Sequence, residues 1–121
     1  MVQRFRPTRV ADITDGTSNT LMVSEKRLNL ATLGQPEPDD NEGYTAGWDE
    51  DTIRSTAQAP QRDFVGSGFD TSRRFGSSHS GGINAVFADG TVRMISYSVN
   101  PVVFGYLGNR SDGQAVNLDD L

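Results

Sequence analysis

The chain has one histidine, His79, and this residue has the clearest capacity for acid–base chemistry. Histidine is the side chain whose charge ordinarily changes between pH 5 and 8. Ser77, Ser78, Gly81 and Gly82 lie around it, and such small residues allow a ligand to approach the backbone closely. His79 is therefore a candidate metal ligand or general base. The simpler interpretation is that its ring hydrogen-bonds a neighbouring strand and holds the loop in place.

Aspartates could join His79 at a divalent metal ion. In an extended segment Asp49 and Asp51 would lie on the same side, where they could share a hard cation such as calcium. Asp89 precedes Gly90, and an Asp-Gly pair is also what a hairpin turn favours. His79, Asp49, Asp51 and Asp89 are thus the candidate ligands of a calcium or zinc ion. A solvated acidic loop and a turn residue are the simpler interpretations of these aspartates.

Hydrolytic chemistry is the main catalytic alternative. No serine lies in a Gly-x-Ser-x-Gly sequence, the turn that presents the nucleophile in many hydrolases. A serine enzyme would have to pair His79 with Ser24 or Ser78, and no spacing orients these side chains. A metal-assisted hydrolase of activated esters or phosphoesters, in which His79 and carboxylates activate a water, is easier to assemble.

A calcium-stabilised binding module is a further alternative. The segment 109–113 is rich in oxygen-bearing, turn-forming side chains, as calcium loops are, but it lacks the spaced ligands and final glutamate of an EF-hand. None of these candidate sites has a full set of catalytic residues. A structural role without catalysis is therefore the leading hypothesis.

Composition limits the possible functions and partners. The length of 121 residues suits a single globular domain spanning 1–121. With 11 basic and 16 acidic residues the net charge is -5, which argues against sequence-independent binding to nucleic acid. The absence of cysteine excludes disulfides, thiolate metal sites and a cysteine nucleophile. No apolar stretch approaches the about 18 residues of a membrane span, so we expect a soluble chain.

A β-hairpin over 83–96 is the most strongly predicted element. Asp89-Gly90 predicts a two-residue type I′ turn, whose central residues both need positive φ. This turn would pair Phe87 with Val92, Ala85 with Met94 and Ile83 with Ser96. Residues directly opposite each other share a face of the sheet, so one apolar face is predicted. Its members are Ile83, Ala85, Phe87, Val92 and Met94.

The other predicted elements are short. The apolar run 21–24 predicts a buried strand, although 21–33 could instead form a helix. Asn100 as N-cap and Pro101 at the first position predict a helix near 100–107, with Val103, Phe104 and Leu107 packed inward. The acidic, proline-broken segment 34–43 predicts an exposed loop, and 44–48 predicts an edge strand. Together these elements indicate an α+β fold with a small antiparallel sheet.

The hairpin region also carries a specific pattern, in which His79 is followed by nine residues and then Asp89-Gly90. This pattern resembles a signature near the C-terminus of certain prepilin-type proteins. The wider sequence resembles a large, poorly characterised family abundant in planctomycete bacteria. The segments 13–26, 46–54 and 96–107 match that family as well.

The resemblance implies the globular head of a pseudopilin-like protein, with a role in assembly at the cell envelope or in secretion. Members of that family begin with a hydrophobic helix, which this sequence lacks. We therefore expect the chain to be the C-terminal head of a longer protein, whose only membrane contact is through the missing helix. Other pilin-like subunits are the expected partners. Without the helix, an apolar strip on the sheet should favour homo-oligomers.

Overall fold

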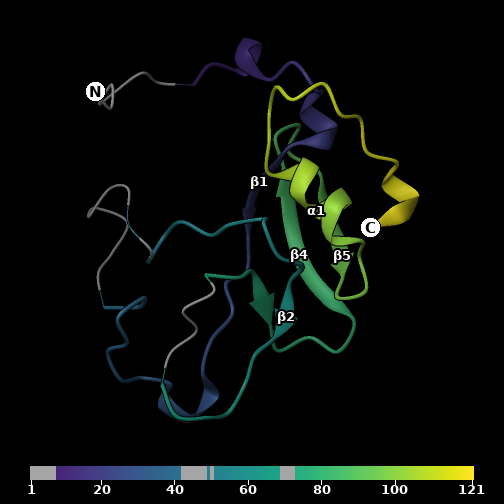
Figure 1. The fold of residues 1–121 in the computed structure, drawn as a ribbon. Helices are drawn as coiled ribbons and strands as arrows, with labels where there is room; N and C mark the ends of the chain where they lie inside the picture. Colours follow the sequence, from purple (N-terminus) through teal and green to yellow (C-terminus); the bar gives the residue numbers. More distant parts are fainter. Residues whose placement is uncertain (1–7, 42–48, 50, 69–72) are drawn as a thin grey trace.

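The computed structural model describes residues 8–41, 49, 51–68 and 73–121, and the structural statements below concern these residues. A three-stranded antiparallel sheet has the order β1-β4-β5 and is accompanied by a two-stranded parallel sheet of β2 and β3 (Figure 1). One α-helix follows the sheet. This arrangement confirms the predicted α+β class. The strands and the helix are β1 (Leu21–Ser24), β2 (Gln61–Arg62), β3 (Gly76–Ser77), β4 (Gly82–Phe87), β5 (Val92–Ser96) and α1 (Pro101–Leu107).

Short 3-10 helices occupy parts of the connecting segments. They lie at Val10–Asp12, Thr17–Asn19, Leu30–Thr32 and Leu118–Asp120. None of the helices in the described ranges is long and apolar enough to cross a membrane.

The core lies between one face of the sheet and α1, which crosses the hairpin in Figure 1. The central strand β4 supplies alternate residues to this face, because successive side chains of a strand point to opposite sides. Phe104 and Leu107 of α1 are fully buried against them, and the Phe104 ring meets Phe75 edge-on at a centroid distance of 6.0 Å. The buried apolar residues are Ile83, Ala85, Phe87, Ile95, Val99, Phe104, Leu107 and Val116.

The hairpin forms where predicted, but its register is shifted by one residue. Val86 pairs with Val92, and Ile83 pairs with Ile95. Gly90 has a φ of 84°, whereas Asp89 is not among the residues with positive φ. The Gly90 N–H donates to the Phe87 carbonyl at 2.9 Å, and the loop has three residues. A three-residue loop ending in a left-handed glycine replaces the predicted two-residue turn, and the extra residue changes the pairing.

The shifted register corrects the predicted apolar face. Ile83, Ala85 and Phe87 are buried, as predicted, but they share the core face with Ile95. Val92 and Met94 lie on the opposite face of the sheet and are 67% and 60% exposed. A one-residue change in register moves every side chain of a strand to the other face, which accounts for the error.

The helix prediction is confirmed. The Asn100 side chain accepts a hydrogen bond from the Val102 N–H, and Pro101 occupies the first turn of α1. Phe104 and Leu107 are buried and Val103 packs against the core. These features are local to the segment, so they could be predicted from its residues alone.

Strand β1 spans the predicted residues, and no helix forms there, but the prediction that it is buried is wrong. Among the residues that the structure describes, the strand lies at the edge of the sheet and pairs with β4 alone. Leu21 packs against the core, whereas Met22 and Val23 are 61% and 57% exposed. An irregularity in the pairing with β4 lies between Leu21 and Val23.

The predicted acidic loop is without helix or strand over its described part, 34–41. Most of this segment is exposed, as predicted, but Asp39 is buried. The predicted edge strand at 44–48 lies outside the described residues, as do the last two residues of the acidic loop.

Candidate functional site

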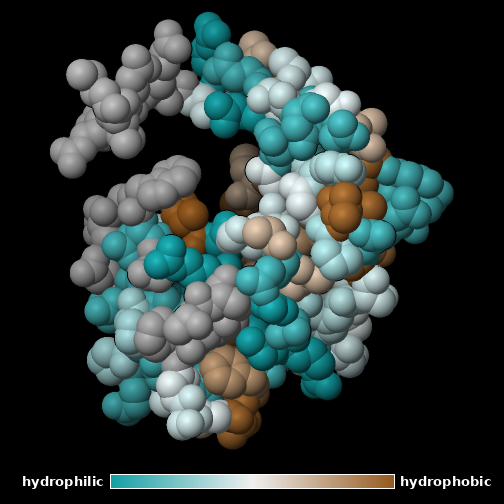
Figure 2. Space-filling model, viewed as in Figure 1, coloured by the Kyte–Doolittle hydropathy of each residue, from teal (hydrophilic) through white to brown (hydrophobic). Residues whose placement is uncertain are grey.

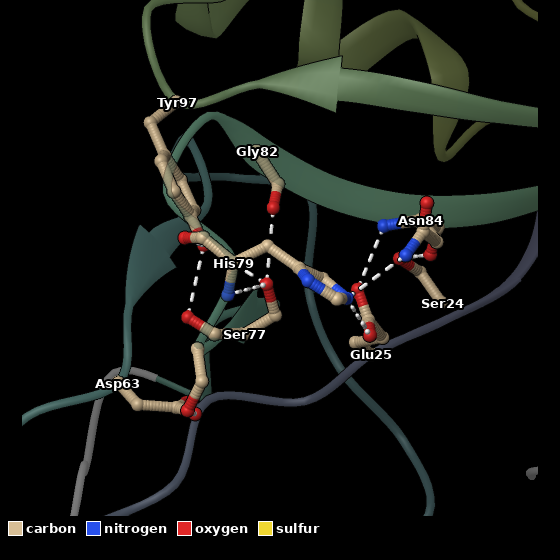
Figure 3. A network of polar contacts seen from close by, with 9 residues as sticks. Ser24, Glu25, Asp63, Ser77, His79, Gly82, Asn84 and Tyr97 are labelled. Atoms are coloured by element: carbon tan, nitrogen blue, oxygen red, sulfur yellow. Dashed lines mark hydrogen bonds and ion pairs between the residues drawn. The ribbon is translucent and has the colours of Figure 1, made fainter.

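His79 lies in the loop between β3 and β4, and its ring points toward the chain that continues from β1 (Figure 3). The Nε2 atom is 3.1 Å from Oε1 of Glu25 and 3.0 Å from the amide nitrogen of Asn84. The side chain of His79 remains 56% exposed. The ring is therefore held by two residues while one side of it faces solvent.

Glu25 and Ser24 continue the hydrogen bonding of β4 where the β1 backbone leaves it. The second Glu25 oxygen, Oε2, accepts from the Asn84 backbone N–H at 2.7 Å. The Ser24 hydroxyl donates to the Asn84 carbonyl at 2.7 Å. Beyond this point Lys26 bridges to Phe75, next to β3. The two side chains thus take the place of backbone partners as the chain passes from one sheet to the other.

The pair with Glu25 determines which ring nitrogen of His79 carries hydrogen. A carboxylate only accepts hydrogen bonds, so this contact requires a hydrogen on Nε2. The same nitrogen cannot also accept from the Asn84 amide, so Asn84 completes the contact when its side-chain oxygen faces the ring. In a neutral ring, Nδ1 therefore keeps the lone pair. Any base chemistry at His79 would have to use Nδ1.

The loop that carries His79 is closed by Ser77 and Tyr97. The Ser77 hydroxyl lies 3.0 Å from the Gly82 carbonyl, to which it donates, and it accepts from the His79 N–H at 3.1 Å. The Tyr97 hydroxyl lies within 2.9 Å of the Ser77 carbonyl and 3.1 Å of the His79 carbonyl. Residue Ser77 is buried. These contacts fix the backbone on both sides of His79.

The hydroxyl groups considered as nucleophiles are engaged elsewhere. Ser78 donates to Oδ2 of Asp63 at 2.6 Å, and Oδ1 of Asp63 accepts from the Leu28 N–H at 2.8 Å. Ser24 donates to the backbone of Asn84, as described above. In the described part of the chain, no hydrogen bond joins either hydroxyl to the His79 ring. Ser78 and Asp63 instead tie the loop to the segment that follows β1.

Gly82 serves the sheet rather than a ligand. A Cβ at this position would lie 2.1 Å from the Ile95 carbonyl oxygen of β5, a separation that real side chains do not reach. The absence of a side chain is what allows β4 and β5 to pair here. The small residue that suggested close approach of a ligand is accounted for by close approach of a neighbouring strand.

Asp89 lies at the other end of β4 from His79, in the hairpin loop. Its Oδ1 accepts from the Thr91 hydroxyl at 2.7 Å and from the Thr91 N–H at 2.9 Å. The hydrogen bond from the Thr91 hydroxyl is the main reason that the pKa of Asp89 lies below its ordinary value, and Arg93 adds to the effect. These contacts match the turn interpretation of Asp89.

Asp49 and Asp51 lie in a different segment, with the Asp51 N–H donating to Oδ1 of Asp49 at 3.2 Å. Asp51 is 8% exposed, and its carbonyl oxygen lies 3.5 Å from the Lys26 ammonium. Within the described ranges, no group of three histidine, aspartate or glutamate side chains is arranged to hold a metal ion. A calcium or zinc site that uses His79, Asp49, Asp51 and Asp89 stays a prediction.

Segment 109–113, the other predicted calcium loop, uses its oxygen atoms for the backbone. Oδ1 of Asn109 accepts from the Ser111 N–H at 3.2 Å, and Oδ1 of Asp112 accepts from the Gln114 N–H at 2.9 Å. The Asp15 carboxylate caps the same loop by accepting from the N–H groups of Asp112 and Gly113, at 2.6 and 3.0 Å. These contacts tie the loop to the N-terminal part of the chain.

A buried ionic cluster was not predicted from the sequence. Arg54 and Asp39 form an ion pair of 2.6 Å, with side chains 3% and 9% exposed. The Lys26 ammonium lies 2.6 Å from the Asp39 carbonyl and 2.5 Å from Oδ1 of Asp40. Burial raises the pKa of Asp39, and the charges of Arg54 and Lys26 oppose that rise. The partners are distant in sequence, and an acidic, proline-containing segment gives no signal for burial.

Glu25 is the site residue that sequence reasoning missed. It lies in the segment 13–26 that carried the family resemblance, but nothing there linked it to His79. The two residues are 54 positions apart. Only the pairing of β1 with β4 brings them together.

Comparisons with known proteins give a family but no function. The sequence matches, over residues 1–102, the model of a family described as a protein of unknown function (DUF1559). Searches of curated proteins and of solved structures found no match. The family match covers well over half of the chain. The chain therefore belongs to the DUF1559 family.

Proposed function

We propose that the chain is the pseudopilin-like globular head of an envelope protein, with a structural role in assembly. Its partners are further copies of itself or other pilin-like subunits. The observation that carries this proposal is an apolar row on the outer face of the three-stranded sheet. Val23 pairs with Val86, and Val86 pairs with Val92, so these side chains form a line across β1, β4 and β5. Met94 lies on the same face, two residues beyond Val92.

The outer face has the character of an association surface. Val23, Val92 and Met94 are 57%, 67% and 60% exposed, although each belongs to a regular strand. The opposite face of the same strands is covered by α1 and forms the core. Contiguous exposed apolar side chains on a sheet are commonly covered by another protein surface. A second sheet face or a helix of a neighbouring subunit would provide that cover.

The polar cluster at His79 supports the structural interpretation of this residue. Glu25, Asn84 and the backbone contacts of Ser77 and Tyr97 hold the loop between β3 and β4. This is the arrangement expected of a residue that secures the sheet carrying the apolar row. The resemblance to prepilin-type proteins, of which His79 and Asp89 are part, points the same way.

Sedimentation velocity over a wide concentration range tests the proposal. We expect the wild-type chain to associate as concentration rises, and Val92→Lys to remain monomeric because a charge cannot be buried in an apolar interface. Val102→Lys is the matched control, since Val102 is 59% exposed but lies on α1. It should associate as the wild type does. A wild-type chain that is monomeric at every concentration, or equal behaviour of the two variants, would refute the proposal.

A hydrolase is the second candidate, and the pair of Glu25 with His79 is what favours it. A carboxylate that orients an exposed imidazole is the usual support of a general base. Its test is turnover of activated esters and phosphoesters, with and without added zinc or a chelator. Turnover that Glu25→Gln and His79→Ala both abolish would establish catalysis and exclude the purely structural function. Rates equal to buffer under all these conditions would exclude the hydrolase.

A further inference from the structure

Three side chains that can bind a metal ion meet at Nε2 of His79. This nitrogen lies 3.1 Å from Oε1 of Glu25 and 3.0 Å from the terminal amide group of Asn84. The hydrogen on Nε2 requires the amide to present its oxygen to the ring. Two oxygen atoms, one of them from a carboxylate, therefore lie beside one imidazole nitrogen (Figure 3).

We propose that His79, Glu25 and Asn84 bind a divalent transition-metal ion such as zinc. Imidazole nitrogen is a ligand of such ions, whereas calcium and magnesium prefer oxygen alone. Zinc binds nitrogen and oxygen ligands at about 2.0–2.2 Å in a tetrahedron, which places two ligand atoms about 3.4 Å apart. The distances at Nε2 are only slightly shorter than this, so small side-chain movements would admit the ion.

Hydrogen bonds on their far sides hold the three ligands in place. Oε2 of Glu25 accepts from the Asn84 N–H at 2.7 Å, while Oε1 contacts the ring. The Ser24 hydroxyl donates to the Asn84 carbonyl at 2.7 Å. The Tyr97 hydroxyl lies 3.1 Å from the His79 carbonyl and fixes the backbone of the loop. Outer contacts of this kind orient metal ligands and raise affinity, so the site is arranged before an ion binds.

The site is accessible to ions from solvent. The side chains of His79 and Glu25 are 56% and 36% exposed, and Asn84 is exposed as well. Figure 2 shows mainly hydrophilic and intermediate surface over the region that the loop between β3 and β4 occupies in Figure 1. Three protein ligands with an exposed side leave a fourth position for a water molecule, as in open zinc sites.

Binding of the ion changes the position of the hydrogen on the His79 ring. In the metal-free neutral ring, Nε2 carries the hydrogen and Nδ1 the lone pair. A metal ion on Nε2 needs the lone pair there, so Nε2 gives its proton to solvent and Nδ1 takes one up. The neutral ring gains and loses no net proton. An adventitious ion on Nδ1 would instead leave the hydrogen on Nε2.

Titration with zinc chloride, followed by nuclear magnetic resonance of the ring nitrogens, tests the site. His79 is the single histidine of the chain, so its signals are assigned without ambiguity. At neutral pH we expect saturable binding of one zinc ion per chain and movement of the hydrogen from Nε2 to Nδ1. Calcium chloride should leave the ring signals unchanged. A hydrogen that stays on Nε2, or zinc binding that does not saturate, would overturn the inference.

Three variants, each checked for folding by its amide spectrum, test the ligands. Glu25→Gln should weaken zinc binding by about tenfold or more, because it removes the charged ligand but keeps an acceptor for the Asn84 N–H. Asn84→Asp should strengthen binding by about tenfold, because a charged ligand replaces a neutral one. Asp89→Asn is the matched control, since its carboxylate lies at the other end of β4, and it should bind zinc as the wild type does.

The variants also define the results that would contradict the site. Equal zinc affinity of Glu25→Gln and Asp89→Asn would exclude the carboxylate as a ligand. Absence of any gain in Asn84→Asp would exclude the amide position. The inference goes beyond the functions proposed above, because its readouts are zinc affinity and the ring hydrogen. Failure of this site is therefore distinguishable from failure of association or of turnover.

Discussion

His79 and Glu25 join the loop before β4 to the chain that leaves β1, with 3.1 Å between Nε2 and Oε1. The same carboxylate accepts from the Asn84 backbone N–H at 2.7 Å, so one side chain connects β1, the loop and β4. At this point the chain stops pairing with β4, and Lys26 pairs with Phe75 beside β3 instead. The contact between the two residues therefore holds the chain beside β4 just beyond the end of β1, where a side chain takes the place of a backbone partner.

We expect Glu25→Ala to destabilise the fold more than His79→Ala does. Loss of the carboxylate removes two hydrogen bonds, to the Asn84 N–H and to the His79 ring, and each should cost about 0.5–1.5 kcal/mol. Loss of the ring removes its contacts with Glu25 and Asn84 but leaves the Glu25 carboxylate bonded to the Asn84 N–H, and it should cost about 0.5–1.5 kcal/mol. Because both variants break the same contact, the double variant should be less destabilised than the sum.

Denaturant unfolding measures these differences in the free energy of unfolding. Asp120→Ala, which removes an exposed carboxylate near the C-terminus, is the control and should stay within about 0.5 kcal/mol of the wild type. Additive effects of the two single changes would show that Glu25 and His79 act independently.

The observed hairpin register predicts opposite outcomes for neighbouring residues of β5. Ile95→Ala should lower the free energy of unfolding by about 2–5 kcal/mol, because Ile95 is fully buried and its loss leaves a cavity. Met94→Ala should change it by no more than about 0.5 kcal/mol, because Met94 is 60% exposed. The two-residue turn would have placed Met94 in the core, so a larger loss for Met94→Ala than for Ile95→Ala would restore that register.

Substitution of Gly90 should weaken the hairpin through its backbone conformation alone. The φ of Gly90 is 84°, and apart from its two chain neighbours no described residue has an atom within 4 Å of a Cβ placed there. Gly90→Ala should therefore cost about 1–2 kcal/mol, the penalty of the left-handed conformation. Gly90→Asn should cost less, because asparagine tolerates this conformation. Equal melting temperatures of the two variants would show that φ is not the source of the effect.

The pKa of Asp89 predicts part of the acid dependence of stability. Its value in the folded chain is lowered from 3.8, chiefly by the Thr91 hydroxyl, so the folded state holds the proton less tightly than the unfolded state does. The resulting stabilisation is present above pH 3.8 and is lost as pH falls through the lowered pKa. Above pH 3.8, Asp89→Asn should therefore melt at a lower temperature than the wild type.

The difference in melting temperature between Asp89→Asn and the wild type should depend on pH. The difference between Asp89→Asn and the wild type should shrink steadily as the solution is acidified below the ordinary pKa of aspartate. Differential scanning calorimetry from neutral pH downward would measure it. A difference that stays constant over the whole range would show that ionisation of Asp89 contributes nothing to stability.

Features that depend on a few adjacent residues were predictable from the sequence. The bounds of β1, the position of the hairpin and the start of α1 follow from local preferences for turns, caps and strands. Those preferences act within a few positions of the chain. The Asn100 cap illustrates this, because its acceptor and the donor on Val102 are two residues apart.

Features that depend on the path of the chain were decided only by the tertiary structure. A three-residue loop in place of a two-residue one moved Val92 and Met94 from the core to the exposed face, and the sequence Asp89-Gly90 is compatible with both. The pairing of Glu25 with His79 crosses 54 positions and arises from the contact of β1 with β4. Local propensity determined the elements, whereas the packing of distant segments determined which side chains meet, because contacts between distant residues depend on the whole fold.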